Sequence, residues 1–307
     1  MSEIEFRAMG SDAHVIVVGG PADGAERARA RIDQLEQRWS RFIDDSEISI
    51  LNRRAGEFVE VSDDTRLLVE LAIEAWRISG GSFDPTVLGA VIRAGYDRSF
   101  EALGDAPKAG LSSLLLGCTD IDITAQGVRL PADTGFDPGG IGKGLGADIV
   151  AEDAMNGGAD GVCINLGGDL RVRGCSPDGG GWTIDIEHPL VTEPIARVGV
   201  SEGAVATSTT LKRQWKVEGA PRHHLIDPAT GLPSDSDLTL ACVISAQAWA
   251  AEVLAKAVLL RGSAHPFDLL GGTGAQALVV DRDGRIDATD GFAAYLGDAT
   301  LPTRLPS

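Results

Sequence analysis

Apolar residues recur at spacings of three and four positions in several segments, which is the pattern of an amphipathic helix. Residues 22–39 form the first such segment, and its predicted buried positions are Ala25, Ala28, Ile32, Leu35 and Trp39. A second helix is predicted to begin near Ser62, because Asp63 and Asp64 suit a helix N-terminus, and to stop at Gly80-Gly81. Its predicted buried positions are Leu68, Leu71, Ala75 and Trp76. Residues 141–155 and 249–260 predict two further helices.

Short apolar runs between and after these helices predict strands. They lie at residues 14–18, 162–166, 170–172, 182–186, 238–244 and 277–280. The last run precedes a DRDG sequence typical of a hairpin turn. Helices and strands do not alternate in the rhythm of a doubly wound parallel sheet, and no Pro- or Ser-rich linker or repeat divides the chain. We therefore predict an α+β fold, a single two-lobed domain over residues 1–307 with mixed or antiparallel sheets and packed helices.

Composition narrows the class of protein. The 307 residues are 43% hydrophobic and 23% charged, which is typical of a globular chain. Acidic residues outnumber basic ones by 45 to 27, and the net charge of −18 argues against nucleic acid as a partner. No apolar run approaches the roughly 20 residues of a membrane span, and residues 1–20 lack a signal-peptide pattern, so we expect a cytoplasmic location. The four cysteines form no C-x-x-C pair and are predicted to be small buried residues.

The densest glycine cluster is DPGGIGKGLGAD at residues 137–148, directly before a predicted helix. Backbone N–H groups at a helix start, together with Lys143, can bind a phosphate. A Walker A loop would need glycine at Asp137, and a dinucleotide fingerprint would need an apolar strand at residues 133–135, so both are excluded. The alternative is a glycine-rich turn with a surface lysine. The following helix is expected to lose stability from Gly142, Gly144 and Gly146.

Other polar blocks admit both a structural and a chemical interpretation. INLGGDLRVRG at residues 164–174 by itself predicts a hairpin. In HHLIDPATGLP at residues 223–233, His224 is the best candidate for proton transfer, although a histidine beside a turn is often structural. Asp84 in SFDPTV is either a functional acid or the start of an Asp-Pro turn, and Ser46 can simply cap the segment after it.

The order of the blocks is more specific than any single block. The series runs MGS (9–11), RFIDDSEISILN (41–52), GGSFDPTV (80–87), DPGGIGKG (137–144), INLGGDL (164–170), IDIEHP (184–189), VATS (205–208) and HLIDPATGLP (224–233). It covers nearly the whole chain and resembles the ApbE-like FAD:protein FMN transferases. The resemblance implies a T-fold-related α+β domain that cleaves FAD, joins FMN by a phosphoester bond to a Thr or Ser of an acceptor flavoprotein, and releases AMP. The alternatives are an FAD-binding or flavin-trafficking protein, or an FAD pyrophosphatase, of the same fold.

The resemblance also implies roles for individual residues. The implied FAD contacts are Met9, Phe42, Ser82, Phe83, Asp84, Asp137, Lys143 and, through its backbone, Ile226. His224 matches the base proposed for the family, and Asp84 is the reserve. The implied Mg²⁺ ligands are the carbonyl of Gly140 and the carboxylate of Glu252.

The chain departs from the family at the metal position. The last helix of the family normally offers Asp and, four residues later, Thr to magnesium, whereas Glu252 and Lys256 stand there in this chain. A protonated lysine cannot ligate a metal. One hypothesis is that the Lys256 ammonium takes the place of the metal, and the alternative is an i, i+4 helical ion pair between Glu252 and Lys256. Thr209 also replaces the usual glycine after the VATS block, which predicts a reshaped acceptor or flavin side of the site.

Overall fold

The computed structural model describes residues 1–100, 117–217 and 220–305. They divide into two compact units. Unit 1 combines three stretches of sequence, 1–33, 143–211 and 236–307. Unit 2 consists of residues 34–142 and 212–235. Helix α1 (Gly24–Trp39) contains the first boundary between them.

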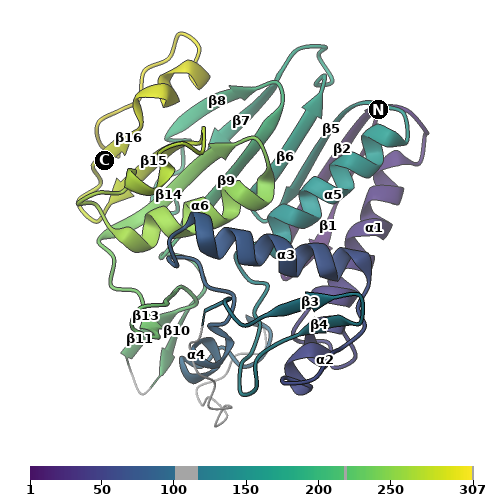
Figure 1. The fold of residues 1–307 in the computed structure, drawn as a ribbon. Helices are drawn as coiled ribbons and strands as arrows, with labels where there is room; N and C mark the ends of the chain where they lie inside the picture. The colour runs from purple at the N-terminus through teal and green to yellow at the C-terminus, as the bar shows by residue number, and fades with distance from the viewer. Residues whose placement is uncertain (101–116, 218–219, 306–307) are drawn as a thin grey trace. The chain divides into compact units, whose positions relative to one another are not determined.

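Unit 1 is built on one eight-stranded sheet with the order β1-β2-β5-β6-β9-β14-β15-β16 (Figure 1). The strands are β1 (Ser2–Ala8), β2 (Ser11–Gly19), β5 (Ala159–Leu166), β6 (Asp169–Gly174), β9 (Gly203–Thr209), β14 (Leu238–Ser245), β15 (Gln276–Asp281) and β16 (Ile286–Ala288). Every neighbouring pair is antiparallel. This confirms the α+β prediction and the predicted hairpin after residue 280.

Both faces of this sheet are covered. A hairpin of β7 (Trp182–Ile186) and β8 (Ala196–Val200) shares one hydrophobic core with sheet residues such as Val205. Helices α5 (Gly142–Asn156) and α6 (Ala248–Arg261) lie across the sheet in Figure 1, and α6 packs on β9 and β14. Because side chains alternate along a strand, Ala204 and Ala206 lie on the face opposite Val205, where their small size lets α6 approach closely.

Unit 2 contains helices of six to 16 residues and two-stranded hairpins. Its elements are α2 (Glu47–Arg53), α3 (Asp63–Ile78), α4 (Leu88–Arg93), β3 (Asp122–Thr124), β4 (Gly127–Arg129), β10 (Gln214–Val217), β11 (Ala220–His223), β12 (Ile226–Asp227) and β13 (Leu232–Pro233). Ser46 caps α2 by accepting the Ser49 N–H at 3.0 Å, and Ser62 caps α3 by accepting the Thr65 N–H at 3.4 Å. The capping interpretation of Ser46 is therefore confirmed.

The predicted helices all form, but some burial predictions are wrong. In α3, Leu71 and Trp76 are only half-buried, while Thr65 is buried, and its hydroxyl is satisfied by accepting the Trp39 indole N–H at 3.1 Å. Three cysteines are buried as predicted, whereas Cys175, just past the end of β6, is half-buried. No helix in the described part of the chain combines the length and apolar character needed to cross a membrane.

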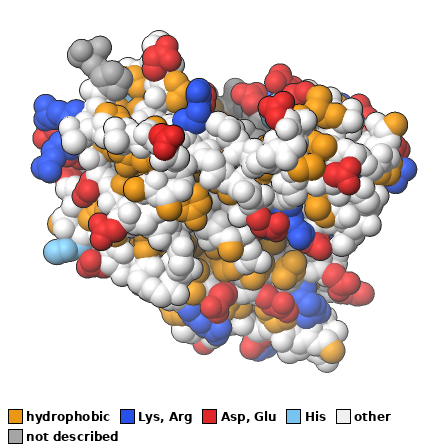
Figure 2. Space-filling model, turned by 90° about the horizontal axis from the view of Figure 1, so that it is seen from above, with side chains coloured by type: hydrophobic (Ala, Val, Ile, Leu, Met, Phe, Trp, Pro, Cys, Tyr) orange, Lys and Arg blue, Asp and Glu red, His pale blue; other side chains and the backbone are white. Residues whose placement is uncertain are grey.

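Surface charge is distributed rather than segregated on the face in Figure 2. On that face, lysine and arginine side chains of the described residues occur singly or in small groups beside aspartate and glutamate.

Candidate active site

Lys143 is the centre of a buried charged cluster in unit 1. It lies in the first turn of α5 and donates from Nζ to the carboxylate of Asp169 and to Oε1 of Glu252, the latter at 3.1 Å. The side chains of Asp169 and Glu252 are only 4% and 5% exposed, while that of Lys143 is 22% exposed. Buried carboxylates require such a partner. The lysine therefore combines two internal carboxylates with a partly accessible ammonium group.

The turn between β5 and β6 determines where Asp169 lies. Leu166 pairs with Asp169 across a two-residue turn in which Gly167 and Gly168 have φ values of +69° and +96°. Such a turn requires positive φ at both positions, which glycine adopts without steric cost. A Cβ on Gly167 would also lie 2.6 Å from the side chain of Ser11. The INLGGD block is therefore the predicted hairpin and also places a carboxylate beside Lys143.

Gly144 allows α5 and α6 to meet backbone to backbone. Its N–H donates to Oε2 of Glu252 at 2.8 Å. A Cβ at this position would lie only 2.3 Å from the carbonyl oxygen of Ala248. The glycine that the sequence marked as a weakness of the helix is therefore required for this close approach.

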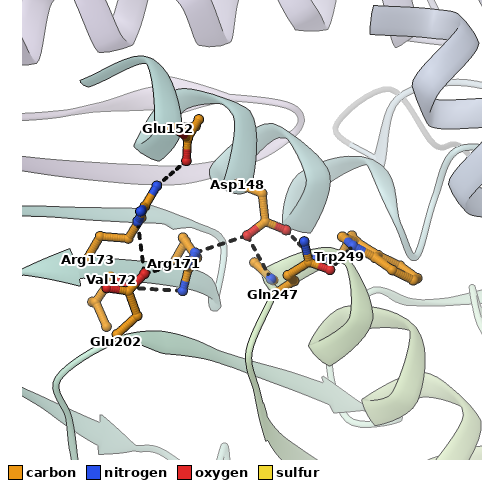
Figure 3. Close-up of polar contacts among 9 residues, drawn as sticks. Asp148, Glu152, Arg171, Val172, Arg173, Glu202, Gln247 and Trp249 are labelled. Carbon is orange, nitrogen blue, oxygen red and sulfur yellow. Dashed lines mark hydrogen bonds and ion pairs between the residues drawn. The ribbon is translucent and has the colours of Figure 1, made fainter. Parts of the chain in front are cut away.

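Asp148 fixes the start of α6, as Figure 3 shows. Its carboxylate accepts the N–H groups of Ala248 and Trp249, each at 2.9 Å, and lies 3.2 Å from Nε of Arg171. Burial raises the pKa of Asp148, and the hydrogen bonds from α6 and the charge of Arg171 oppose that rise. Because Asp148 belongs to α5, it ties the helix of Lys143 to the helix of Glu252.

The same network continues along β6 (Figure 3). Arg171 also pairs with Glu202 at 3.2 Å, and Arg173 pairs with both Glu202 and Glu152. Glu202 is 58% exposed, so the outer pairs contribute little stability individually, while Arg171 is only 10% exposed. The inner pair of Asp148 and Arg171 is the part that holds α5, α6 and β6 together.

Met9 lies in the turn between β1 and β2, with φ of +50°, followed by Gly10 at +66°. A residue other than glycine is uncommon in this left-handed region. Its Cε is 3.3 Å from the point that a Cβ on Gly146 would occupy, so the side chain covers the first turns of α5. Met9 and Lys143, both predicted FAD contacts, are thus brought to the same end of α5.

Lys256 follows Glu252 by one helical turn and is 8% exposed. The residues present do not fit a magnesium site. Mg²⁺ prefers oxygen ligands in near-ideal octahedral geometry, but both oxygens of Glu252 already accept hydrogen bonds and Lys256 adds a cation on the same helix face. Within residues 1–100, 117–217 and 220–305, no group of three or more His, Cys, Asp or Glu side chains is arranged to hold a metal ion.

Thr209, at the other departure from the family pattern, secures the end of β9. Its hydroxyl donates to the Thr239 carbonyl at 2.7 Å and accepts the Leu211 N–H at 3.1 Å.

In unit 2, Asp137 organises the start of the glycine-rich block. Its Oδ1 accepts the Gly139 N–H at 3.0 Å and lies 3.6 Å from Nε of Arg41, and its own N–H donates to the Pro85 carbonyl at 2.7 Å. Gly140, whose carbonyl is a predicted metal ligand, has φ of +107° and so adopts a conformation that favours glycine. The glycine-rich block and the SFDPTV block therefore lie side by side.

Asp84 forms the predicted Asp-Pro turn. Its Oδ1 accepts both the N–H of Thr86 at 2.7 Å and the hydroxyl of Thr86 at 2.6 Å. The preceding Phe83 is fully buried, and its N–H donates to the hydroxyl of Ser79 at 3.0 Å. The half-buried Ser82 precedes this pair. Oδ1 of Asp84 thus has a structural role in the turn, and a chemical role would fall to Oδ2.

The two adjacent histidines have different surroundings. His223 interacts with the backbone at both ring nitrogens, Nε2 with the Ser234 carbonyl at 2.9 Å and Nδ1 with the Leu225 N–H at 3.3 Å. Burial lowers the pKa of His223, so its neutral form is favoured. This geometry assigns a structural role to His223. His224 is half-buried, and Ile226, two residues on, packs in a core with Val87 of the SFDPTV block.

Phe42 belongs to an aromatic cluster that the sequence did not reveal. Its ring is 5.8 Å from Tyr96, which is 5.5 Å from Trp215, and the guanidinium of Arg41 lies 4.2 Å from the Phe42 ring centroid. Arg41 also donates to the Tyr96 carbonyl at 2.9 Å. Phe42 is 40% exposed, so part of its ring is accessible to a planar ligand. An RF pair alone was not a sufficient signal, because Tyr96 and Trp215 lie far away in the sequence.

Comparison with known proteins shows which family this chain belongs to. A profile described as the ApbE family matches residues 9–279. The FAD:protein FMN transferase of Vibrio cholerae is 26% identical over 279 residues, covering 88% of this chain and 81% of that protein. The one of Treponema pallidum is 29% identical, covering 85% of this chain and 78% of that protein. Two solved structures share the fold at 24% identity: the ApbE protein of Thermotoga maritima, with a TM-score of 0.85 over 96% of this chain and 99% of that one, and the flavinyl transferase ApbE of Pseudomonas stutzeri, with a TM-score of 0.82 over 97% and 98%. This chain therefore belongs to the ApbE family.

Proposed function

We propose that this chain is an FAD:protein FMN transferase, which attaches FMN to a Thr or Ser hydroxyl of an acceptor flavoprotein and releases AMP. The observation that carries the proposal is the cluster around Lys143 at the start of α5. Relatives named FAD:protein FMN transferase match this chain over most of their own length. An ammonium group and backbone N–H groups at a helix N-terminus suit the diphosphate of FAD.

In the proposed reaction, the acceptor hydroxyl oxygen bonds to the FMN-side phosphorus of FAD. The bond from this phosphorus to the bridging oxygen breaks, and AMP leaves with that oxygen. His224 takes the hydroxyl proton, because His223 is occupied by the backbone at both ring nitrogens. Asp84 is the reserve base. Lys143 offsets the negative charge of the transferring group.

The remaining proposed contacts hold FAD in place. They are Met9, Phe42, Ser82, Phe83, Asp84, Asp137 and Ile226. Phe83 and Ile226 are almost completely buried, so their contribution would come from the backbone. Phe42 offers an accessible ring. Gly140 and Glu252 are the positions of the implied metal, but no step is assigned to magnesium, since the surroundings of Glu252 do not suit it.

The test is incubation of the purified protein with FAD and a cell extract that contains candidate acceptors, followed by a denaturing gel viewed by flavin fluorescence and by mass spectrometry of the fluorescent band. A transferase gives a covalently fluorescent protein with FMN on Thr or Ser, and AMP in equal amount. Formation of FMN and AMP at the same rate without an acceptor would identify an FAD pyrophosphatase instead. Recovery of intact FAD from the protein in both reactions would identify a flavin-binding protein.

A further inference from the structure

We propose that the ammonium groups of Lys143 and Lys256 take the place of a divalent metal ion at this site, so that FAD binding and FMN transfer by this chain require no such ion. The inference rests on the proposed function, on the buried cluster of Lys143, Asp169 and Glu252, and on Lys256, which lies one helical turn beyond Glu252 on α6.

The first argument is the state of Glu252. Its Oε1 accepts from Nζ of Lys143 at 3.1 Å and its Oε2 from the N–H of Gly144 at 2.8 Å. The residue is 4% exposed. A magnesium ion would have to compete with an ammonium group and a backbone amide for the same two oxygens. Glu252 is thus arranged as a hydrogen-bond acceptor within the protein.

The second argument is the place of Lys256. Residues four apart on a helix are neighbours on one face, so Lys256 lies next to Glu252 along α6. The residue as a whole is only 8% exposed, so most of its side chain is removed from solvent. Bringing a divalent cation to the same helix face would place like charges together at reduced dielectric, which is unfavourable. Lys256 therefore replaces a metal ligand of the family and also adds a positive charge.

The third argument is that the scaffold fixes these charges. Asp148 accepts both of the first N–H groups of α6, and Gly144 permits direct contact between the two helices. Asp169 is held at the start of β6 by the β5–β6 turn, so the carboxylate that binds Lys143 belongs to a regular hairpin. Charges held in advance stabilise a phosphoryl transition state without reorganisation.

The inference predicts how FAD binds in the absence of metal. The purified protein is treated with EDTA and titrated with FAD, and the quenching of flavin fluorescence is recorded with EDTA and again with millimolar MgCl₂. We expect the two Kd values to agree within about twofold. A tightening of about tenfold or more by magnesium would overturn the inference while leaving the proposed function intact. Failure to bind FAD under either condition would overturn the proposed function and the inference with it.

A second measurement needs no FAD. Mn²⁺ binding is followed by electron paramagnetic resonance for the unmodified protein and for the double variant E252D/K256T, which restores the ligand types of the family. We expect Mn²⁺ binding only in the double variant. The control Lys212→Thr removes one exposed lysine and should behave like the unmodified protein. Tight Mn²⁺ binding by the unmodified protein would overturn the inference, even if the double variant fails to fold.

Discussion

Replacing Gly144 with alanine tests the contact that brings Glu252 to Lys143. The added Cβ would lie 2.3 Å from the carbonyl oxygen of Ala248, 2.5 Å from its carbonyl carbon and 2.7 Å from the nitrogen of Trp249. All three are backbone atoms, so no side-chain rotation can relieve the overlap. The helices must separate, which lengthens the bond from the Gly144 N–H to Glu252.

Two opposing effects set the magnitude. Alanine is favoured over glycine inside a helix by up to about 1 kcal/mol. Overpacking typically costs about 1–3 kcal/mol, and weakening a hydrogen bond to a buried carboxylate adds about 1–3 kcal/mol. The overlap therefore wins, and we expect Gly144→Ala to lower the free energy of unfolding by about 2–4 kcal/mol.

Urea unfolding followed by circular dichroism measures this change. Gly142→Ala is the matched control two residues away, because its Cβ would meet only Pro138 at 3.5 Å, an ordinary contact. We expect the control to stay within about 0.5 kcal/mol of the unmodified protein. If Gly144→Ala were as stable as Gly142→Ala, the close approach of α5 and α6 would be refuted, and so would the account of Glu252.

Three further predictions concern other residues. Asp148→Ala should destabilise the protein by about 2–4 kcal/mol in urea, because it removes a helix cap and leaves the buried Arg171 without this partner, whereas loss of an exposed acid costs less than about 1 kcal/mol. Burial lowers the pKa of His188 and His223 below 6.5, so near and below that pH the unfolded chain binds more protons than the folded protein. The free energy of unfolding should therefore fall as the pH drops below 6.5. A free energy that is constant or rises as the pH falls from 7.5 to 5.5 would contradict this. His224→Asn should reduce FMN transfer about 100- to 10,000-fold with little change in the Kd for FAD, while His223→Asn should mainly lower stability, and a normal transfer rate in His224→Asn would exclude it as the base.

Helices whose signal lies within a short stretch of sequence were predicted from that stretch alone. The amphipathic repeats gave α1 and α3, and the Ser62 cap lies where the sequence placed it. β1 was missed because its alternation is carried by only two large apolar residues, Ile4 and Phe6, which stand between charged residues. In α6 nearly every residue is buried, so the repeat could not show which side faces the sheet.

The candidate site depends on contacts that no local pattern contains. Lys143 was identified from its glycine-rich block, but its partner Asp169 was noted only as part of a hairpin. Gly144 looked destabilising because the reason for it, the carbonyl of Ala248, lies more than a hundred residues further along the chain. Sequence order was sufficient to indicate the family, whereas the pairing of charges required the packing of α5 against α6.

The assembly of unit 1 from separate stretches of sequence has a consequence for biosynthesis. Val15 of β2 lies opposite Ile164 of β5, and residues 34–142 are translated between them. While the ribosome makes that insert, the edge of β2 that later pairs with β5 is open, and such edges favour association with other chains. Pairing over this distance also slows folding. Soluble yield should therefore depend on chaperone protection of the nascent chain until β5 emerges.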